Sequence, residues 1–142
     1  SQDIVVVPQS HANFVAQVSK DLDRQLARIH FDPREDATGI AKVRFQASPD
    51  GRATQVEIYQ RSGSGQLDSA ARRAVRGLTN LTPLPYGSED GQVIQANIVV
   101  AGSRQEMQRL TSRLSREEAA RIARSPQERA VLALTLAPRP VS

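Results

Sequence analysis

The chain has 142 residues, 39% of them hydrophobic, which is enough for one domain with its own core. It has no cysteine, so disulfide bonds, thiolate metal sites and cysteine nucleophiles are excluded. The net charge of +4 is carried almost entirely by arginine, and Tyr59 and Tyr86 are too few for an aromatic stacking platform, so we expect no nucleic-acid partner. No apolar run approaches the ~20 residues that cross a bilayer, so we expect a soluble protein.

The first predicted element is an amphipathic helix over residues 12–30. Its apolar residues recur at spacings of three and four: Val15, Val18, Leu22, Leu26 and Ile29. Pro33 in the following segment disfavours a helical conformation for the residue before it. We therefore expect a turn after this helix.

A hairpin follows. Apolar and polar residues alternate from Ala41, with Val43 and Phe45 on the buried face and Lys42 and Arg44 on the other. The sequence SPDG at residues 48–51 is typical of a tight turn. Residues 53–61 then continue as a second strand whose inward residues are Val56 and Ile58.

A short helix and a third strand complete this part of the chain. The helix follows the Ser/Gly-rich residues 62–65, and its apolar face is formed by Leu67, Ala70, Ala71, Ala74, Val75 and Leu78. A loop rich in proline and glycine leads to residues 92–101. There Ile94, Ala96 and Ile98 share one face, and Gln95 and Asn97 the other.

The C-terminal part of the sequence is different in kind. Ser103, Ser115 and Ser125 each begin a capping box, so we predict three short helices. Leu110 and Leu114 need a place to bury, either on the sheet or on the other helices.

These elements predict an α+β fold with a three-stranded antiparallel sheet packed by two helices (α-β-β-α-β) and a helical C-terminal tail. We divide the chain into an N-terminal segment (1–10), a domain (11–102) and a helical extension (103–142).

The Ser/Gly-rich turn at residues 62–65 has three interpretations. A phosphate cradle usually carries a lysine, which this turn lacks, and Asp68 would repel phosphate. A nucleophile elbow needs the spacing G-x-S-x-G, and His11 and His30 lie in no recognisable catalytic or metal-binding pattern. We therefore interpret the turn as a hinge and expect neither enzyme activity, nor a cofactor, nor a metal.

The order and spacing of several short motifs resemble the C-terminal domain of the TonB family, with the TolA C-terminal domain as a relative. The matching pieces are the strand with Val43 and Phe45, the turn Asp50-Gly51, Ser62-Gly63, LDSAA at 67–71 and PLP at 83–85. With the flanking helix and third strand, the resemblance covers roughly residues 13–101.

The resemblance implies a periplasmic peptide-binding module. Its last strand would receive the TonB box of an outer-membrane TonB-dependent transporter as an added strand. The edge residues would be Gln92, Val93, Ile94, Gln95, Ala96, Asn97, Ile98 and Val99. Main-chain pairing would tolerate different guest sequences, and Gln92, Gln95 and Asn97 would provide selectivity. The alternative is that this edge of the sheet is covered, either by the helices of the tail or by a second copy of the chain.

Further partners depend on features outside the family's minimal domain. An inner-membrane complex of the ExbB/ExbD type would be a partner if an anchor precedes Ser1, and a homodimer is a further expectation. The exposed arginines of the short helix, Arg72, Arg73 and Arg76, form either a solvated face or a surface for an acidic partner. The tail and the missing anchor favour an alternative function, a structural or regulatory periplasmic protein that has lost energy transduction.

The N-terminal segment contains DIVVV at residues 3–7, which resembles a TonB box. Its β-branched residues favour a strand. It would either add to this sheet as an extra strand, in cis or from a neighbouring chain, or remain a frayed terminus.

Overall fold

The computed structural model describes residues 9–137. Its elements in chain order are α1 (Gln9–Ala27), β1 (Gly39–Ala47), β2 (Ala53–Gln60), α2 (Gly65–Arg76), β3 (Ile94–Val100), α3 (Arg104–Arg124), α4 (Pro126–Arg129) and β4 (Leu132–Leu136). The α+β class and the order of the first five elements agree with the sequence prediction. Residues 3–7, the predicted extra strand, lie outside the described residues.

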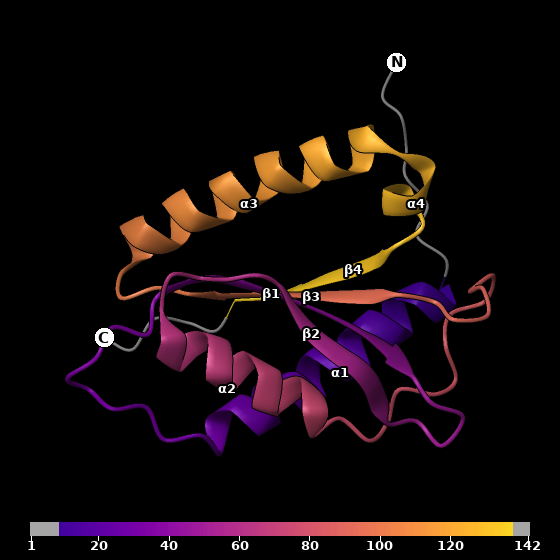
Figure 1. Cartoon of the computed structure of the whole chain (residues 1–142), viewed down its shortest axis with the longest axis horizontal. Helices are drawn as coiled ribbons and strands as arrows, with labels where there is room; N and C mark the ends of the chain where they lie inside the picture. Colours follow the sequence, from indigo (N-terminus) through magenta and orange to yellow (C-terminus); the bar gives the residue numbers. More distant parts are fainter. Residues whose placement is uncertain (1–8, 138–142) are drawn as a thin grey trace.

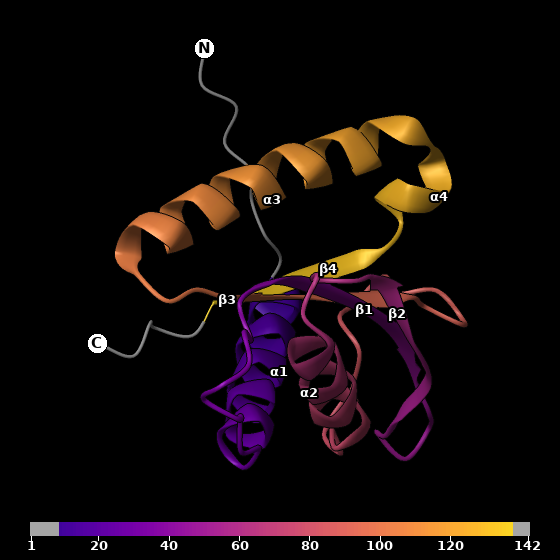
Figure 2. The ribbon, with the colours of Figure 1, turned by 60° about the vertical axis from the view of Figure 1, so that its left-hand side comes forward.

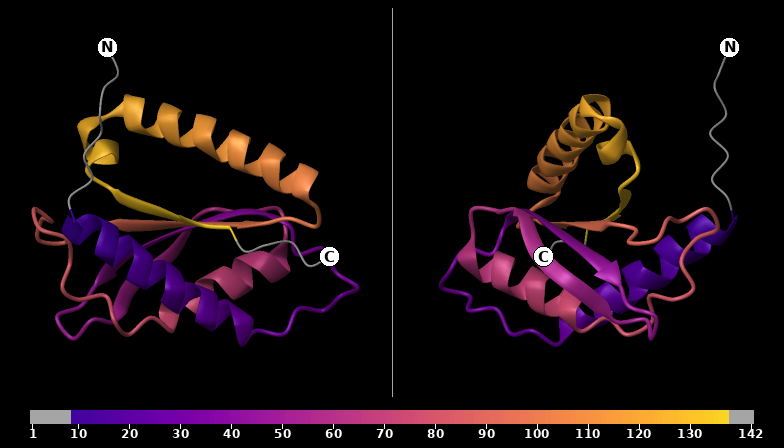
Figure 3. Two further views of the ribbon diagram at one scale, coloured as in Figure 1. Left: turned by 180° about the vertical axis from the view of Figure 1, so that it is seen from behind. Right: turned by 45° about the vertical axis from the view of Figure 1, so that its right-hand side comes forward.

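The fold has three layers, which Figure 1 and Figure 2 show from two sides. A four-stranded sheet of order β2-β1-β3-β4 forms the middle layer. Helices α1 and α2 cover one face of the sheet, and α3 crosses the other face. Seen from behind, α1 runs along the sheet on the side of β4 (Figure 3). None of the helices within residues 9–137 is long and apolar enough to cross a membrane.

The sheet is mixed, so the predicted three-stranded antiparallel sheet is incomplete. Strand β1 pairs antiparallel with β2 and β3, as predicted, but β4 joins β3 in parallel. Parallel neighbours need a crossover connection, and here α3 provides it. The C-terminal tail therefore completes a β-α-β unit with β3, the last strand of the predicted domain.

The main core lies between the sheet and the helices α1 and α2. It includes the predicted apolar faces of both helices, among them Val18, Leu22, Leu67 and Val75. On β3 the predicted inward residues Ile94, Ala96 and Ile98 are fully buried in this core. Leu134 of β4 also belongs to it, so the tail shares the core of the domain.

The tail contains one long helix, one helical turn and a strand, where three short helices were expected. Ser103 and Ser125 cap α3 and α4 as predicted, each accepting a hydrogen bond from the N–H of the Glu three residues later. Ser115 begins no helix, because the chain around it continues α3 without a break. Residues 132–136 form a strand because β3 offers them a row of main-chain partners.

Candidate functional site

Strand β3, the predicted peptide-binding strand, has neighbours on both sides. It pairs antiparallel with β1, from Gly39 with Val100 to Phe45 with Ile94. On its other side it pairs in parallel with β4. Of the predicted edge residues 92–99, Ile94 to Ile98 thus form no free edge in this conformation, because the chain's own β4 pairs with them.

The pairing of β3 with β4 uses the main-chain groups of β3 that an added strand would use. The register runs from Ile94 opposite Leu132 to Ile98 opposite Leu136, and the N–H of Leu132 donates to the carbonyl of Val93 at 3.0 Å. Main-chain groups alternate between the two sides of a strand. Those of Gln95 and Asn97 therefore face β4, whereas those of their neighbours in β3 face β1.

The side chains of β4 alternate between two environments. Leu132, Leu134 and Leu136 pack in the main core, where Leu134 is buried and the other two are half-buried. Ala133 and Thr135 lie on the opposite face, and Thr135 is exposed. The segment is therefore held by three leucine side chains and by a continuous main-chain ladder.

The predicted selectivity residues are placed differently from expectation. Gln95 and Asn97 are 0% and 1% exposed, and lie under α3. Both donate to the carboxylate of Glu118, at 3.2 and 3.4 Å. Gln92 lies just before β3, where its side-chain amide donates to the carbonyl of Ala130 at 2.8 Å. In this conformation all three bind the tail.

Charged and amide side chains gather between the sheet and the C-terminal half of α3. This polar cluster consists of Lys42, Arg44, Gln95, Asn97, Glu117, Glu118, Arg121 and Glu128. Lys42 and Arg44 lie on the face away from the main core, as predicted, but that this face is covered was not predicted. The usable signal was the triplet Glu117, Glu118 and Arg121, which shares one side of a helix.

Three elements of the fold are joined by the ion pairs of the polar cluster. The ammonium of Lys42, on β1, lies 3.1 Å from the carboxylate of Glu117 on α3. Arg44, also on β1, donates to both carboxylate oxygens of Glu128 on α4, at 2.6 and 3.2 Å. Arg121 is 3% exposed in its side chain and lies between Glu118 and Glu128. The cluster therefore ties both α3 and α4 to β1.

The pKa values of two carboxyl groups in the cluster are lowered. For Glu118, burial favours the neutral acid, but the hydrogen bonds and charge of Arg121, with Lys42 and Asn97, outweigh this and lower the pKa. For Glu128, the hydrogen bond from Arg44 lowers the pKa more than burial raises it. Both groups are therefore ionised at neutral pH, as the ion pairs require.

Strand β2 is the other outer strand of the described sheet, and it is irregular. Its register with β1 shifts twice, and Gln55 has a positive φ of 53°. Such bulges twist an edge and discourage strand addition. The β3 side of the sheet is therefore the regular one.

The three arginines predicted to face a partner lie on α2, away from the pairing of β3 with β4. Arg72, Arg73 and Arg76 are exposed on α2, which packs against β1 and β2. They do not approach the pairing of β3 with β4. A partner of this face remains a prediction.

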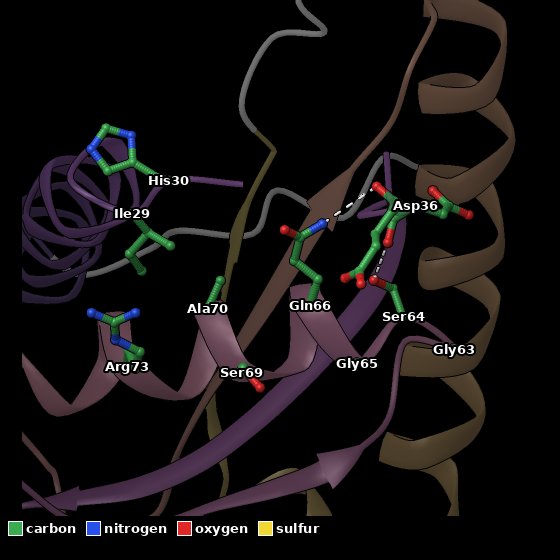
Figure 4. Close-up of a pocket in the computed structure, with 11 residues that line it drawn as sticks. Ile29, His30, Asp36, Gly63, Ser64, Gly65, Gln66, Ser69, Ala70 and Arg73 are labelled. Atoms are coloured by element: carbon green, nitrogen blue, oxygen red, sulfur yellow. Dashed lines mark hydrogen bonds between the residues drawn. The ribbon is translucent and has the colours of Figure 1, made fainter. Parts of the chain in front are cut away.

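A surface cavity of about 680 Å³ lies at the start of α2, beside the loop after α1 (Figure 4). Ser64 caps α2 and donates to the carbonyl of Asp36 at 2.6 Å, and Gln66 donates to the carbonyl of Asp32 at 3.3 Å. Asp68 accepts from the N–H of Ser62 at 2.9 Å. The Ser/Gly turn thus fixes the loop to the helix. No group of three or more His, Asp or Glu within the described chain could hold a metal ion.

Comparison with known proteins gives a match to a family model that covers the central part of the chain. Residues 33–101 match the family model of the Gram-negative bacterial TonB protein C-terminal. No curated protein and no solved structure matches the chain. The match covers β1, β2, α2 and β3 and stops before α3. The chain therefore carries a domain of the TonB C-terminal family, a family of non-enzymatic protein-interaction modules.

Proposed function

We propose that this chain is a periplasmic module of TonB type, which binds a short extended segment of an outer-membrane transporter by strand addition to β3. The pairing of β3 with β4 carries the proposal. Five extended residues of the chain itself already lie on β3 in a regular parallel ladder, so this side of the strand is suited to an added segment. Membership of the TonB C-terminal family supports the identity of the guest.

Binding at this place requires β4 to leave β3. The guest would take over the main-chain groups of Gln95 and Asn97, which β4 uses in the described conformation. Selectivity would then depend on the pockets that the leucines of β4 vacate. In an energy-transducing system, force from an inner-membrane complex of the ExbB/ExbD type would reach the transporter through this added strand.

The second candidate is a structural or regulatory periplasmic protein without energy transduction. The observation in its favour is β4 itself, because a permanently paired β4 would leave no room for a guest. The two candidates differ in whether β4 exchanges with a peptide from a transporter.

The test is a titration of the chain with TonB-box peptides from outer-membrane transporters, followed by NMR of the main-chain amides. The peptide-binding function predicts saturable shifts at Gln95 and Asn97, together with loss of protection in residues 132–136. A scrambled peptide of the same composition is the control. If no transporter peptide shifts these amides, even in a Leu132→Pro variant whose β4 is weakened, the second candidate is supported.

A further inference from the structure

The outer side of α3 is strongly basic. The helix crosses the sheet on the side away from α1 and α2, and its outer side is exposed (Figure 2). Positions at spacings of three and four share one side of a helix, as Arg109, Arg113 and Arg116 do. The exposed arginines of α3, which we call its basic face, are Arg104, Arg109, Arg113, Arg116 and Arg124.

The carboxylates of α3 point toward the fold and not toward this face. The helix contains three glutamates, and none of them is exposed. Glu106 accepts a hydrogen bond from the N–H of Gly102 at 2.7 Å, at the start of the helix. Glu117 and Glu118 belong to the polar cluster between the helix and the sheet. The negative charge of the helix is therefore used within the molecule, and the basic face keeps an excess of positive charge.

The guanidinium groups of the basic face are little neutralised and protrude from the helix. Within residues 9–137, Arg109 and Arg113 each have one long ion pair, at 3.5 and 3.9 Å, and Arg104 and Arg116 have none. Small side chains separate the arginines, so the guanidinium groups extend farthest from the helix axis. These small exposed residues are Ser112, Ser115, Ala119, Ala120 and Ala123.

We propose that the basic face of α3 docks on an anionic membrane surface, with its guanidinium groups among the lipid phosphates. A guanidinium pairs two of its N–H groups with phosphate oxygens. Clusters of about four to eight basic residues on an amphipathic helix are typical of binding to anionic lipids. The proposal adds a second interaction surface and does not depend on the peptide-binding function.

The layout of the basic face favours a flat partner. Its arginines are spread along a helix of 21 residues, about 30 Å, and do not converge on one point. The helix has no aromatic side chain on which bases of a nucleic acid would stack. Ile122, at 43% exposed, adds a large apolar group that can enter the headgroup region. With α3 on the membrane, the outer edge of the sheet at β4 would remain accessible from the side.

The experiment measures co-sedimentation of the full chain with vesicles. One set is phosphatidylcholine alone, and in the other about a third of the lipid is the anionic phosphatidylglycerol. We expect binding to the anionic vesicles alone. The affinity should fall at least about tenfold between roughly 50 and 300 mM salt, because ions screen exposed charges.

A triple variant with Arg104→Gln, Arg109→Gln and Arg116→Gln removes three charges that lie outside the polar cluster. It should bind about a hundredfold more weakly, since each basic residue near such a surface contributes about fivefold. The lysine variant of the same three positions keeps the charge and should bind almost as well as the unchanged chain. Thermal melting shows whether each variant is folded.

The matched control removes the same charge from the opposite side of the molecule. It carries Arg72→Gln, Arg73→Gln and Arg76→Gln on α2, which lies across the sheet from α3 (Figure 1). Its affinity should stay within about threefold of the unchanged chain, because these charges lie beyond the range of screened attraction.

Four results would overturn the proposal. The first is equal binding to both kinds of vesicle, or to neither. The second is an equal loss in the α2 variant, which would assign the attraction to the net charge of the chain. The third is a loss in the lysine variant as large as that in the glutamine variant. The fourth is tighter binding of poly-glutamate or duplex DNA than of vesicles, abolished by the α3 variant, which would assign the face to another polyanion.

Discussion

The guanidinium of Arg44 on β1 donates to both carboxylate oxygens of Glu128 on α4, two residues that are 84 positions apart in the sequence. Both side chains are largely buried, at 13% and 20% exposed. Glu128 stands in the single helical turn that precedes β4. This pair therefore ties the start of β4 to the strand on the far side of β3.

The first prediction concerns this pair. Arg44→Gln removes two of the hydrogen bonds that Glu128 accepts and leaves it only its pair with Arg121, whereas Glu128→Gln leaves the largely buried charge of Arg44 without a carboxylate partner. We expect either change to lower the free energy of unfolding by about 1–3 kcal/mol. Denaturant unfolding measures the change. Arg52→Gln is the control, because its exposed ion pair with Asp50 is worth little, and it should stay within about 0.5 kcal/mol of the unchanged chain. Equal effects of Arg44→Gln and Arg52→Gln would contradict a structural role for the Arg44 pair.

Most of the domain follows from local sequence patterns. The period of α1, the alternation in β1 and β3, and the apolar face of α2 each specify an element and its buried side. The tail shows the limit of this reasoning. Ser115 has the sequence of a capping box, yet the residues after it favour a helix equally well inside α3. A cap pattern alone does not say whether a helix starts or continues.

Strand β4 was missed for a different reason. LALTL alternates leucine with small residues, which is a strand pattern, but leucine and alanine are also good helix formers and the run is short. Residues 132–136 become a strand because β3, more than thirty residues away in the sequence, offers them an unpaired side. The covering of the polar face depends on contacts distant in the sequence in the same way. The sequence shows that Lys42 and Arg44 share a face, but only the path of α3 shows that carboxylates lie above them.

The second prediction is a pH dependence. Glu118 and Glu128 have folded-state pKa values below their ordinary value of 4.5, so the unfolded chain binds protons more readily than the folded chain. Their contribution to stability is therefore fully present above pH 4.5 and is lost as the pH falls through the lowered pKa values. Unfolding experiments between pH 7 and 3 should show this loss. In a chain carrying Glu118→Gln and Glu128→Gln the decline should be shallower, with only other carboxyl groups such as Asp36 and Asp50 remaining. An identical decline in both chains would exclude the cluster as a source.

The third prediction concerns the apolar contact between α3 and the sheet. Leu110 and Leu114 are 6% and 5% exposed and pack on Ile40 and Val99. Replacing either with alanine should leave a cavity and lower the free energy of unfolding by about 2–4 kcal/mol. Ile122→Ala, on the same helix, is the matched control. Its side chain is 43% exposed, so a much smaller effect is expected. Unchanged melting of both leucine variants would mean that α3 does not pack stably on the sheet.

The last prediction separates the two sides of β4. Leu132 donates its N–H to Val93, whereas the alternation of the ladder turns the N–H of Ala133 away from β3. Leu132→Pro removes a bond that holds β4, but Ala133→Pro places the ring where an outer strand tolerates it. Hydrogen exchange of the amides of Gln95 and Asn97, which face β4, reports the difference. We expect these two amides to exchange more than tenfold faster in Leu132→Pro and to change little in Ala133→Pro. The amides of β3 that face β1 should remain protected in both variants, since the pairing of β1 with β3 does not involve β4. If Ala133→Pro exposes Gln95 and Asn97 as strongly as Leu132→Pro, the assigned direction of the β4 main chain is wrong, and with it the assignment of Gln95 and Asn97 as the groups that a guest strand would pair.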